Sequence, residues 1–208
     1  QITVKTVDTS ELTFGFANFT ELGGAPAFGT GWGVPDLTGE ILSGTDAKMG
    51  QTQVNDGDPY WIVGGTGGPG NTPAPGSDYA GNKISEATWY GEVDASTLDA
   101  TFQFNADVTA FDLQAPYTVS LVIKQSANGY APVLTPITGT GIVSVQEAVN
   151  PAAGNMLQWG LLMTGPNVVP GDQYRYGSVT ISAVPEPSTF ALLGGLAALG
   201  VVMYRRRK

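Results

Sequence analysis

The sequence predicts an all-β protein, an antiparallel β-sandwich of jelly-roll-like type, followed by one C-terminal transmembrane helix. Short segments of alternating apolar and polar residues recur along the first 184 residues, and turn dipeptides such as Asn128-Gly129 and Pro170-Gly171 separate them. The composition agrees, because 29 Gly and 14 Pro with only 13% charged residues favour short strands and turns over long helices. An uncharged run near the C-terminus predicts the helix.

Seven segments are predicted to be strands, because a period of two places one face of each segment on a core. They are Ile2–Val7, Leu12–Phe16, Thr101–Ala106, Tyr117–Lys124, Gly141–Val145, Met156–Met163 and Tyr176–Ile181. The segment beginning at Tyr117 is the strongest, and we expect it to be central. Residues 64–82 contain seven Gly and three Pro. They predict a long loop, which is either mobile or an arm that contacts a partner.

Composition excludes several classes of function. The chain has no Cys and no His, so thiol chemistry, Cys-ligated zinc and Ser-His-Asp catalysis cannot be built within it. Four of the nine basic residues are the last four, so residues 1–204 carry 5 basic and 18 acidic groups, a formal charge of 5 − 18 = −13. An acidic body repels phosphates, so we expect no nucleic acid partner, and no motif predicts a cofactor.

Carboxylates are the common acid–base groups that remain. Glu86, Glu92, Asp94 and Asp99 are candidates for the acid pair of a glycoside hydrolase, but their spacing singles out no pair. A solvated acidic surface explains them better, and we predict that the protein is not an enzyme. The run Asn55–Asp58 offers oxygen ligands for calcium, yet Asp-Gly is first a turn signal, so no metal site is assigned.

Two aromatic pairs are candidate contact residues. Tyr60-Trp61 and Trp89-Tyr90 flank the glycine-rich segment. Adjacent strand residues point to opposite faces, so one member of each pair can lie in the core and the other at the surface. An exposed aromatic ring stacks on a sugar, anchors a protein partner or lies at a membrane interface, and the sequence leaves these three choices open.

The last 15 uncharged residues, Phe190–Tyr204, predict a membrane anchor. As a helix they span roughly 22 Å, which is short for a bilayer. Tyr204 suits the interface, and the cationic side chains that follow can extend to it. These are Arg205, Arg206, Arg207 and Lys208, which the positive-inside rule places in the cytoplasm against membrane lipid. Residues 1–184 are then a periplasmic or otherwise extracytoplasmic β-sandwich, and residues 185–208 hold a Pro-Glu-Pro motif, the helix and the basic tail. A chain that starts at Gln1 fits the removal of a signal peptide.

Three features occur together at the C-terminus: the motif Pro185-Glu186-Pro187, a short apolar helix and a terminal basic cluster. In this order they resemble the PEP-CTERM sorting signal, and the resemblance covers about the last 25 residues. It implies a Gram-negative-type bacterium, in which an exosortase cuts near the motif and the mature protein often goes to the surface or the extracellular matrix. It implies almost nothing about the fold or activity of the body.

Two hypotheses for function follow. Small residues lie at helical spacing in the tail, which lets helix backbones approach closely; they are Ala191, Gly194, Gly195 and Ala198. We therefore expect a single-pass inner-membrane subunit whose β-sandwich braces the periplasmic face of a respiratory, photosynthetic or secretion complex. The alternative is an exosortase-processed surface or matrix protein with a role in adhesion or glycan binding.

Overall fold

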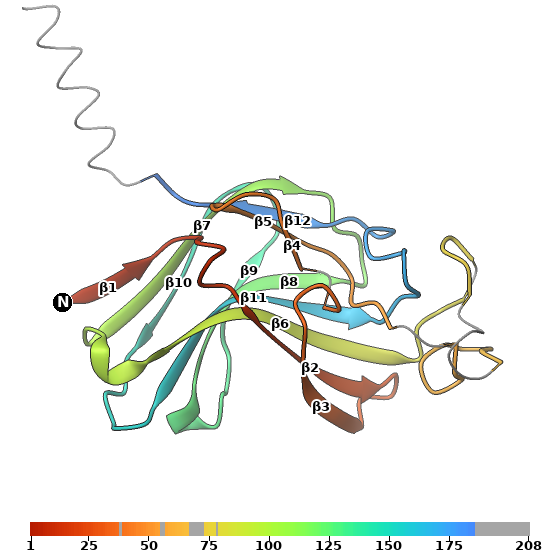
Figure 1. Cartoon of the computed structure of the whole chain (residues 1–208), viewed down its shortest axis with the longest axis horizontal. Helices are drawn as coiled ribbons and strands as arrows, with labels where there is room; N and C mark the ends of the chain where they lie inside the picture. The colour runs from red at the N-terminus through yellow and green to blue at the C-terminus, as the bar shows by residue number, and fades with distance from the viewer. Residues whose placement is uncertain (38, 55–56, 67–72, 78, 186–208) are drawn as a thin grey trace, which may run out of the picture.

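The regular structure of the chain is β, as the sequence predicts. The computed structural model describes residues 1–37, 39–54, 57–66, 73–77 and 79–185 (Figure 1). Over these ranges the strands form two six-stranded sheets. The helices found there are two single turns of 3-10 type, η1 (Ala95–Thr97) and η2 (Ser126–Asn128).

The first sheet has the strand order β1-β7-β12-β5-β4, with β10 paired to β7. The strands are β1 (Ile2–Lys5), β4 (Gly39–Ile41), β5 (Asp46–Met49), β7 (Thr101–Phe111), β10 (Gly141–Ala148) and β12 (Val179–Ser182). This sheet is mixed, because β1 pairs in parallel with β7, whereas the sequence predicts antiparallel sheets throughout. No hairpin joins these two strands, so their connection does not force an antiparallel direction.

The second sheet has the order β3-β2-β6-β11-β8-β9, and all its pairs are antiparallel. Its strands are β2 (Phe14–Glu21), β3 (Pro26–Trp32), β6 (Lys83–Asp94), β8 (Thr118–Gln125), β9 (Val133–Ile137) and β11 (Met156–Pro166). The strand predicted to be central, β8, lies next to the edge strand β9. The centre of the sheet is β6 and β11, which pair over eleven positions.

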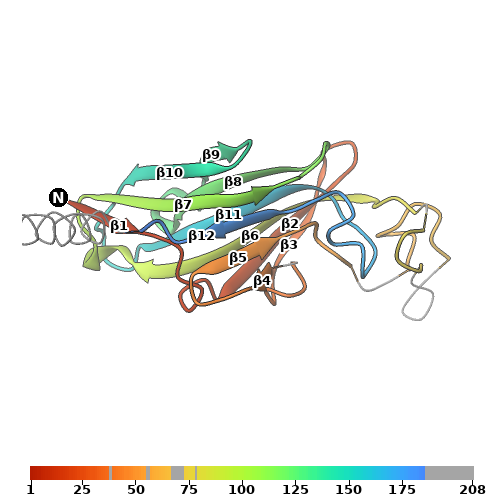
Figure 2. The same cartoon turned by 90° about the horizontal axis from the view of Figure 1, so that it is seen from above.

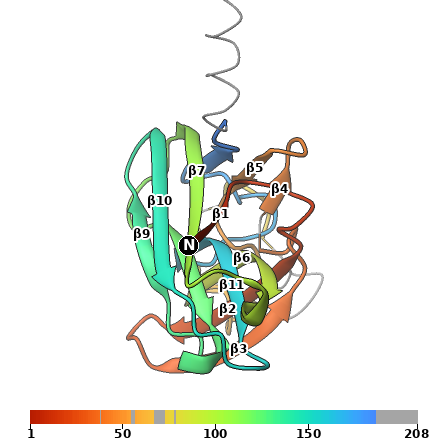
Figure 3. The ribbon, with the colours of Figure 1, turned by 90° about the vertical axis from the view of Figure 1, so that its left-hand side faces the viewer.

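The two sheets face each other around one hydrophobic cluster. Phe102, Phe104 and Ile181 come from the first sheet, and Trp89 and Leu161 from the second, all fully buried. Figures 1 and 3 show the sheets as two layers, and Figure 2 shows their strands running along the long axis of the molecule. At one edge β9 and β10 lie side by side, where the chain passes from one sheet to the other (Figure 3). The face of the second sheet that is turned away from this cluster carries the candidate site.

The end of the body is tied to the first sheet. Beyond β12, the backbone N–H of Ala183 donates to the Thr45 carbonyl, and that of Val184 donates to the Thr6 hydroxyl. No helix in the described ranges has the length and apolarity needed to span a bilayer. The predicted span, Phe190–Tyr204, lies outside those ranges.

Candidate functional site

The candidate site lies on the face of the second sheet that is turned away from the core. Along β6, Ala87 and Trp89 point into the core, whereas Glu86, Tyr90 and Glu92 lie half-buried on the opposite face. This is the alternation that a strand imposes on its side chains. The neighbouring strands β2, β11 and β8 repeat it, so polar and aromatic side chains from four strands share one surface.

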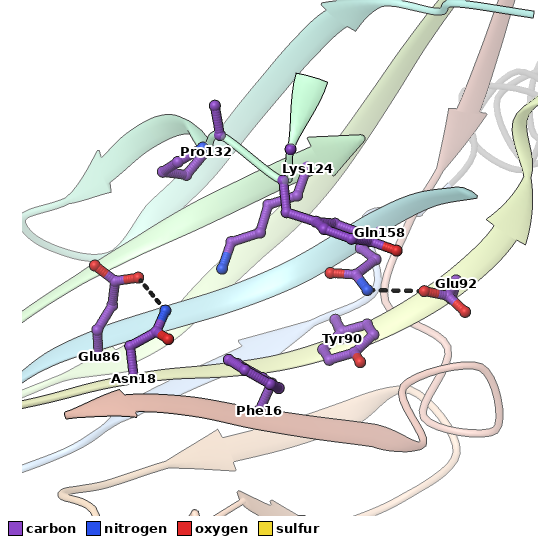
Figure 4. A pocket seen from close by; sticks show the side chains of 11 residues that line it. Phe16, Asn18, Glu86, Tyr90, Glu92, Lys124, Pro132 and Gln158 are labelled. Atoms are coloured by element: carbon purple, nitrogen blue, oxygen red, sulfur yellow. Dashed lines mark hydrogen bonds between the residues drawn. The ribbon is translucent and has the colours of Figure 1, made fainter. Parts of the chain in front are cut away.

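Strand register places amides beside the carboxylates of this face. Asn18 on β2 is opposite Glu86, and its Nδ2 donates to Glu86 Oε1 at 3.5 Å. On β11, Gln158 is opposite Glu92 on one side and Lys124 on the other. Gln158 Nε2 donates to Glu92 Oε2 at 2.7 Å. Figure 4 shows these two pairs at opposite ends of the pocket.

Between the two pairs is a cavity of about 650 Å³, a volume typical of small-ligand sites. The turn after η2 helps to close it, because Gly129 and Tyr130 both adopt a left-handed backbone with φ of 70° and 61°. Such a conformation is rare for tyrosine and reverses the chain over the sheet. The lining comprises Phe16, Asn18, Glu86, Tyr90, Glu92, Lys124, Gly129, Tyr130, Ala131, Pro132 and Gln158.

Lys124 is the cation of this cavity. The residue is only 6% exposed, and its Nζ donates to Thr88 Oγ1 at 2.9 Å. Burial lowers the pKa of Lys124 below its ordinary value because it penalises the charged form, and the negative charge of Glu86 opposes that shift. The ammonium is therefore held in a site where water compensates its charge poorly.

Aromatic rings line the cavity beside this cation. Phe14 stacks on Tyr90, with ring centroids 5.6 Å apart, and Phe16 follows on the same face of β2. Burial raises the pKa of Tyr90, and the charge of Glu92 raises it further. The Tyr90 hydroxyl therefore stays protonated at neutral pH and keeps its capacity to donate a hydrogen bond. Stacked rings next to hydrogen-bonding groups suit a ligand with both apolar and polar faces.

A glycine lets the two central strands of this sheet approach each other closely. Gly160 on β11 lies between Tyr90 on β6 and Val122 on β8. A Cβ built on Gly160 would collide with the carbonyl oxygen of Trp89, so the close approach of β6 and β11 requires glycine here. This close approach fixes the position of Tyr90 relative to β11.

The two glutamates of the groove are far apart along β6. Glu86 and Glu92 both line the cavity, but six residues of one strand separate their backbones by about 20 Å. Retaining and inverting hydrolases hold their two carboxyl groups about 5–9.5 Å apart. Asp94 instead caps η1, and Asp99 accepts a hydrogen bond from the Thr3 hydroxyl.

The four aromatic residues predicted as contacts have different surroundings. Trp89 is fully buried in the core, whereas Tyr90 lies in the groove, as alternation along a strand predicts for such a pair. Tyr60 is 42% exposed and lies outside the groove, with Lys83 Nζ 3.9 Å above its ring. Trp61 is partly buried against the core. Tyr90 is therefore the residue of this set that the structure brings to a cavity, and partner contact by all four stays a prediction.

The remaining predicted sites lie elsewhere or outside the described ranges. Asp58 accepts a hydrogen bond from the backbone N–H of Tyr60, while residues 55–56 are not described. The described residues contain no cluster of three acidic groups that would hold a metal ion. Of the sorting motif, Pro185 is described and exposed; Glu186, Pro187 and all the anchor residues lie outside.

Sequence reasoning named Glu86, Tyr90 and Glu92 as candidates and missed the other groove residues, among them Phe16, Asn18, Lys124 and Gln158. Lys124 carried a signal, since a lysine near the end of a strand with a strongly apolar face is unusual unless its charge is compensated. Asn18 and Gln158 carried no such signal in the sequence, because single amide side chains in strands are common. Only the register of β2, β6, β11 and β8 brings them to one surface.

Comparison with known proteins identifies the tail and leaves the body unassigned. Residues 183–208 match the family described as the PEP-CTERM protein-sorting motif, which confirms the resemblance seen in the sequence. Searches of curated proteins and of solved structures find no significant match to this chain. The match covers the tail alone, so it bears on the destination of the protein and not on the chemistry of the groove.

Proposed function

We propose that this protein is an exosortase-processed surface or matrix protein whose β-sandwich binds a glycan in the groove. The sorting motif at residues 183–208 supports the destination. In this proposal the tail directs the chain to an exosortase, and the body remains outside the cell after the tail is removed. The groove then faces the polysaccharides that surround the cell.

The groove is the observation that supports glycan binding. A sugar ring has an apolar face that stacks on aromatic rings and a rim of hydroxyl groups that need hydrogen-bonding partners. Phe16 and Tyr90 offer stacking surfaces, while Asn18, Glu92 and Gln158 offer donors and acceptors. The pocket extends from the Asn18–Glu86 pair to the Gln158–Glu92 pair (Figure 4), so it suits a chain of sugars better than a compact ligand.

The alternative of a permanent membrane subunit has weaker support. It rests on the small-residue stripe from Ala191 to Ala198, which lies outside the described residues. A sorting motif favours removal of the tail, whereas a subunit needs to retain it. The transmembrane helix, the single-pass inner-membrane location and the jelly-roll-like strand connections stay predictions.

We further propose that the protein has no catalytic activity on its ligand. The carboxylates in the groove are too far apart along β6 for glycoside hydrolysis, and each accepts a hydrogen bond from a neighbouring amide. The chain lacks the histidine and cysteine that most other hydrolytic sites use. Binding is the chemistry that the groove residues support best.

A glycan array tests this proposal. The full chain, purified in detergent, is compared with Tyr90→Ala, which removes a ring from the groove, and with Tyr60→Ala, which removes an exposed ring outside it. We expect the wild type to bind a set of oligosaccharides, Tyr90→Ala to lose about tenfold or more in affinity, and Tyr60→Ala to keep it. Loss with Tyr60→Ala alone would move the site to the other aromatic surface. A wild type that binds no glycan would refute the proposed function.

A further inference from the structure

The Lys124 ammonium has more hydrogen-bond donors than the described residues satisfy. A protonated lysine carries three N–H groups. Among the residues that the structure describes, the Thr88 hydroxyl at 2.9 Å is the only acceptor bonded to Lys124 Nζ. The ion pairs in the same ranges involve Lys5, Lys83 and Arg175, so no described carboxylate forms a salt bridge with Lys124.

This cation is also buried, which makes a missing partner costly. The residue is 6% exposed although it belongs to the wall of a cavity. A charged group taken out of water destabilises the protein unless an opposite charge or several hydrogen bonds compensate it. Figure 4 shows the Lys124 side chain extended along the pocket, and the negative charge of Glu86 acts on its ammonium without forming a salt bridge within the described residues.

The neighbouring carboxylates already have donors of their own. Glu86 accepts from Asn18 at one end of the groove, and Glu92 accepts from Gln158 at the other. Each keeps free lone pairs that suit hydroxyl donors of a ligand. The groove therefore offers acceptors at both ends and one under-compensated cation between them.

We infer that the groove selects sugar chains that carry a carboxylate, and that Lys124 is the residue that binds this group. The inference rests on the proposed function and names the chemical class of its ligand. A ligand carboxylate beside Nζ supplies the acceptors that the protein lacks, and it forms a charge-assisted hydrogen bond in a site shielded from water. The aromatic rings then stack on the sugar, and the end carboxylates accept from its hydroxyl groups.

The acidic body does not prevent such binding. Residues 1–204 carry a formal charge of 5 − 18 = −13, which slows the approach of an anionic chain. Exposed charges are screened over about 8 Å at physiological ionic strength, whereas a contact inside a cavity is screened much less. The contact with Lys124 is therefore screened less than the repulsion from exposed carboxylates. Glu86 and Glu92 also line the cavity, so an anionic sugar chain fits with its carboxylate at Nζ and its hydroxyl groups toward the two glutamates.

A matched pair of ligands tests the inference. Isothermal titration calorimetry compares an oligogalacturonate with its carboxyl-reduced counterpart, which has the same linkages but no charge. We expect the full-length wild type to bind the uronate about tenfold or more tightly than the neutral chain. Equal affinity, or tighter binding of the neutral chain, would overturn the inference and leave the proposed glycan function standing. Binding of neither chain, together with an array without hits, would refute both.

Two variants assign the preference to one side chain. Lys124→Gln keeps a hydrogen-bond donor but removes the charge, and we expect it to bind both ligands with similar affinity, close to that of the wild type for the neutral one. Lys48→Gln is the matched control, since Lys48 lies over the Tyr174 ring on the first sheet; it should keep the full preference for the uronate. A Lys124→Gln variant that still binds the uronate tenfold more tightly than the neutral chain would show that another group binds the carboxylate.

Discussion

Replacing Trp89 by Phe tests how much the buried hydrogen bond of this core residue stabilises the fold. Trp89 is fully buried, and its indole N–H donates to the Leu12 carbonyl at 2.7 Å. The substitution leaves that carbonyl without its partner, at a cost of about 1–3 kcal/mol. The smaller ring also leaves a cavity of roughly 40 Å³, which adds about 1 kcal/mol. We therefore expect the free energy of unfolding to fall by about 2–4 kcal/mol.

Trp159→Phe is the matched control for this measurement. Trp159 is 3% exposed in the same core, and its indole N–H donates to no residue in the described part of the chain. It loses the same volume without orphaning an acceptor, so its cost should be near 1 kcal/mol. Urea unfolding with linear extrapolation measures both variants. Equal losses, or a loss below about 1 kcal/mol for Trp89→Phe, would refute the assigned hydrogen bond and the core position.

Three further measurements follow from the structure and the tail. Hydrogen bonds from Ser182 and Ser43 lower the pKa of Asp46 in the folded state. The ionised carboxylate therefore stabilises the fold at a pH above the pKa of Asp46 in the unfolded chain, and this stability is lost as the pH falls through the pKa of the folded state. Asp46→Asn should therefore flatten the acid limb of a curve of stability against pH. Burial lowers the pKa of Lys124, so the charged form of this residue destabilises the fold at neutral pH. Lys124→Met should therefore raise the midpoint of urea unfolding at pH 7. This gain should shrink as the pH rises toward 10.5, the pKa of lysine in the unfolded chain. An unchanged acid limb or an unchanged midpoint, respectively, would contradict these assignments. The intact mass of the chain from cells of the native host should fall short of 21.6 kDa by the mass of the tail, whereas the full mass in a larger membrane complex would favour the permanent subunit.

Strand prediction succeeded where one face of the strand is strongly apolar. The segment Tyr117–Lys124 matches β8 to within one residue at each end, because Val119, Leu121 and Ile123 all point into the core. The central strand β6 was missed although it is the longest strand described. Its core-facing positions include Ser85, Ala87 and Gly91, which are too small to produce a clear alternation, and Tyr90 places an aromatic ring on the opposite face.

The groove was predictable only in part, for a related reason. Alternation predicts that one residue of the pair Trp89-Tyr90 lies in the core and the other at the surface, but it does not say which; the structure buries Trp89. Lys124 and Gln158 are 34 positions apart in the sequence, and they become neighbours only because β8 and β11 pair in one register. Local sequence does not encode such long-range pairing.

By itself the sequence determined the β class of the body, its acidity, the absence of histidine and cysteine chemistry, and the sorting motif of the tail. Each of these is a local or compositional property, so no knowledge of distant contacts is needed to recognise it. Tertiary structure alone decided that β1 runs parallel to β7, that β6 and β11 approach closely at Gly160, and that Lys124 is buried in a groove where Thr88 is its one acceptor among the described residues. These features depend on which strands pair and in which register, and pairing is set by the packing of the whole core.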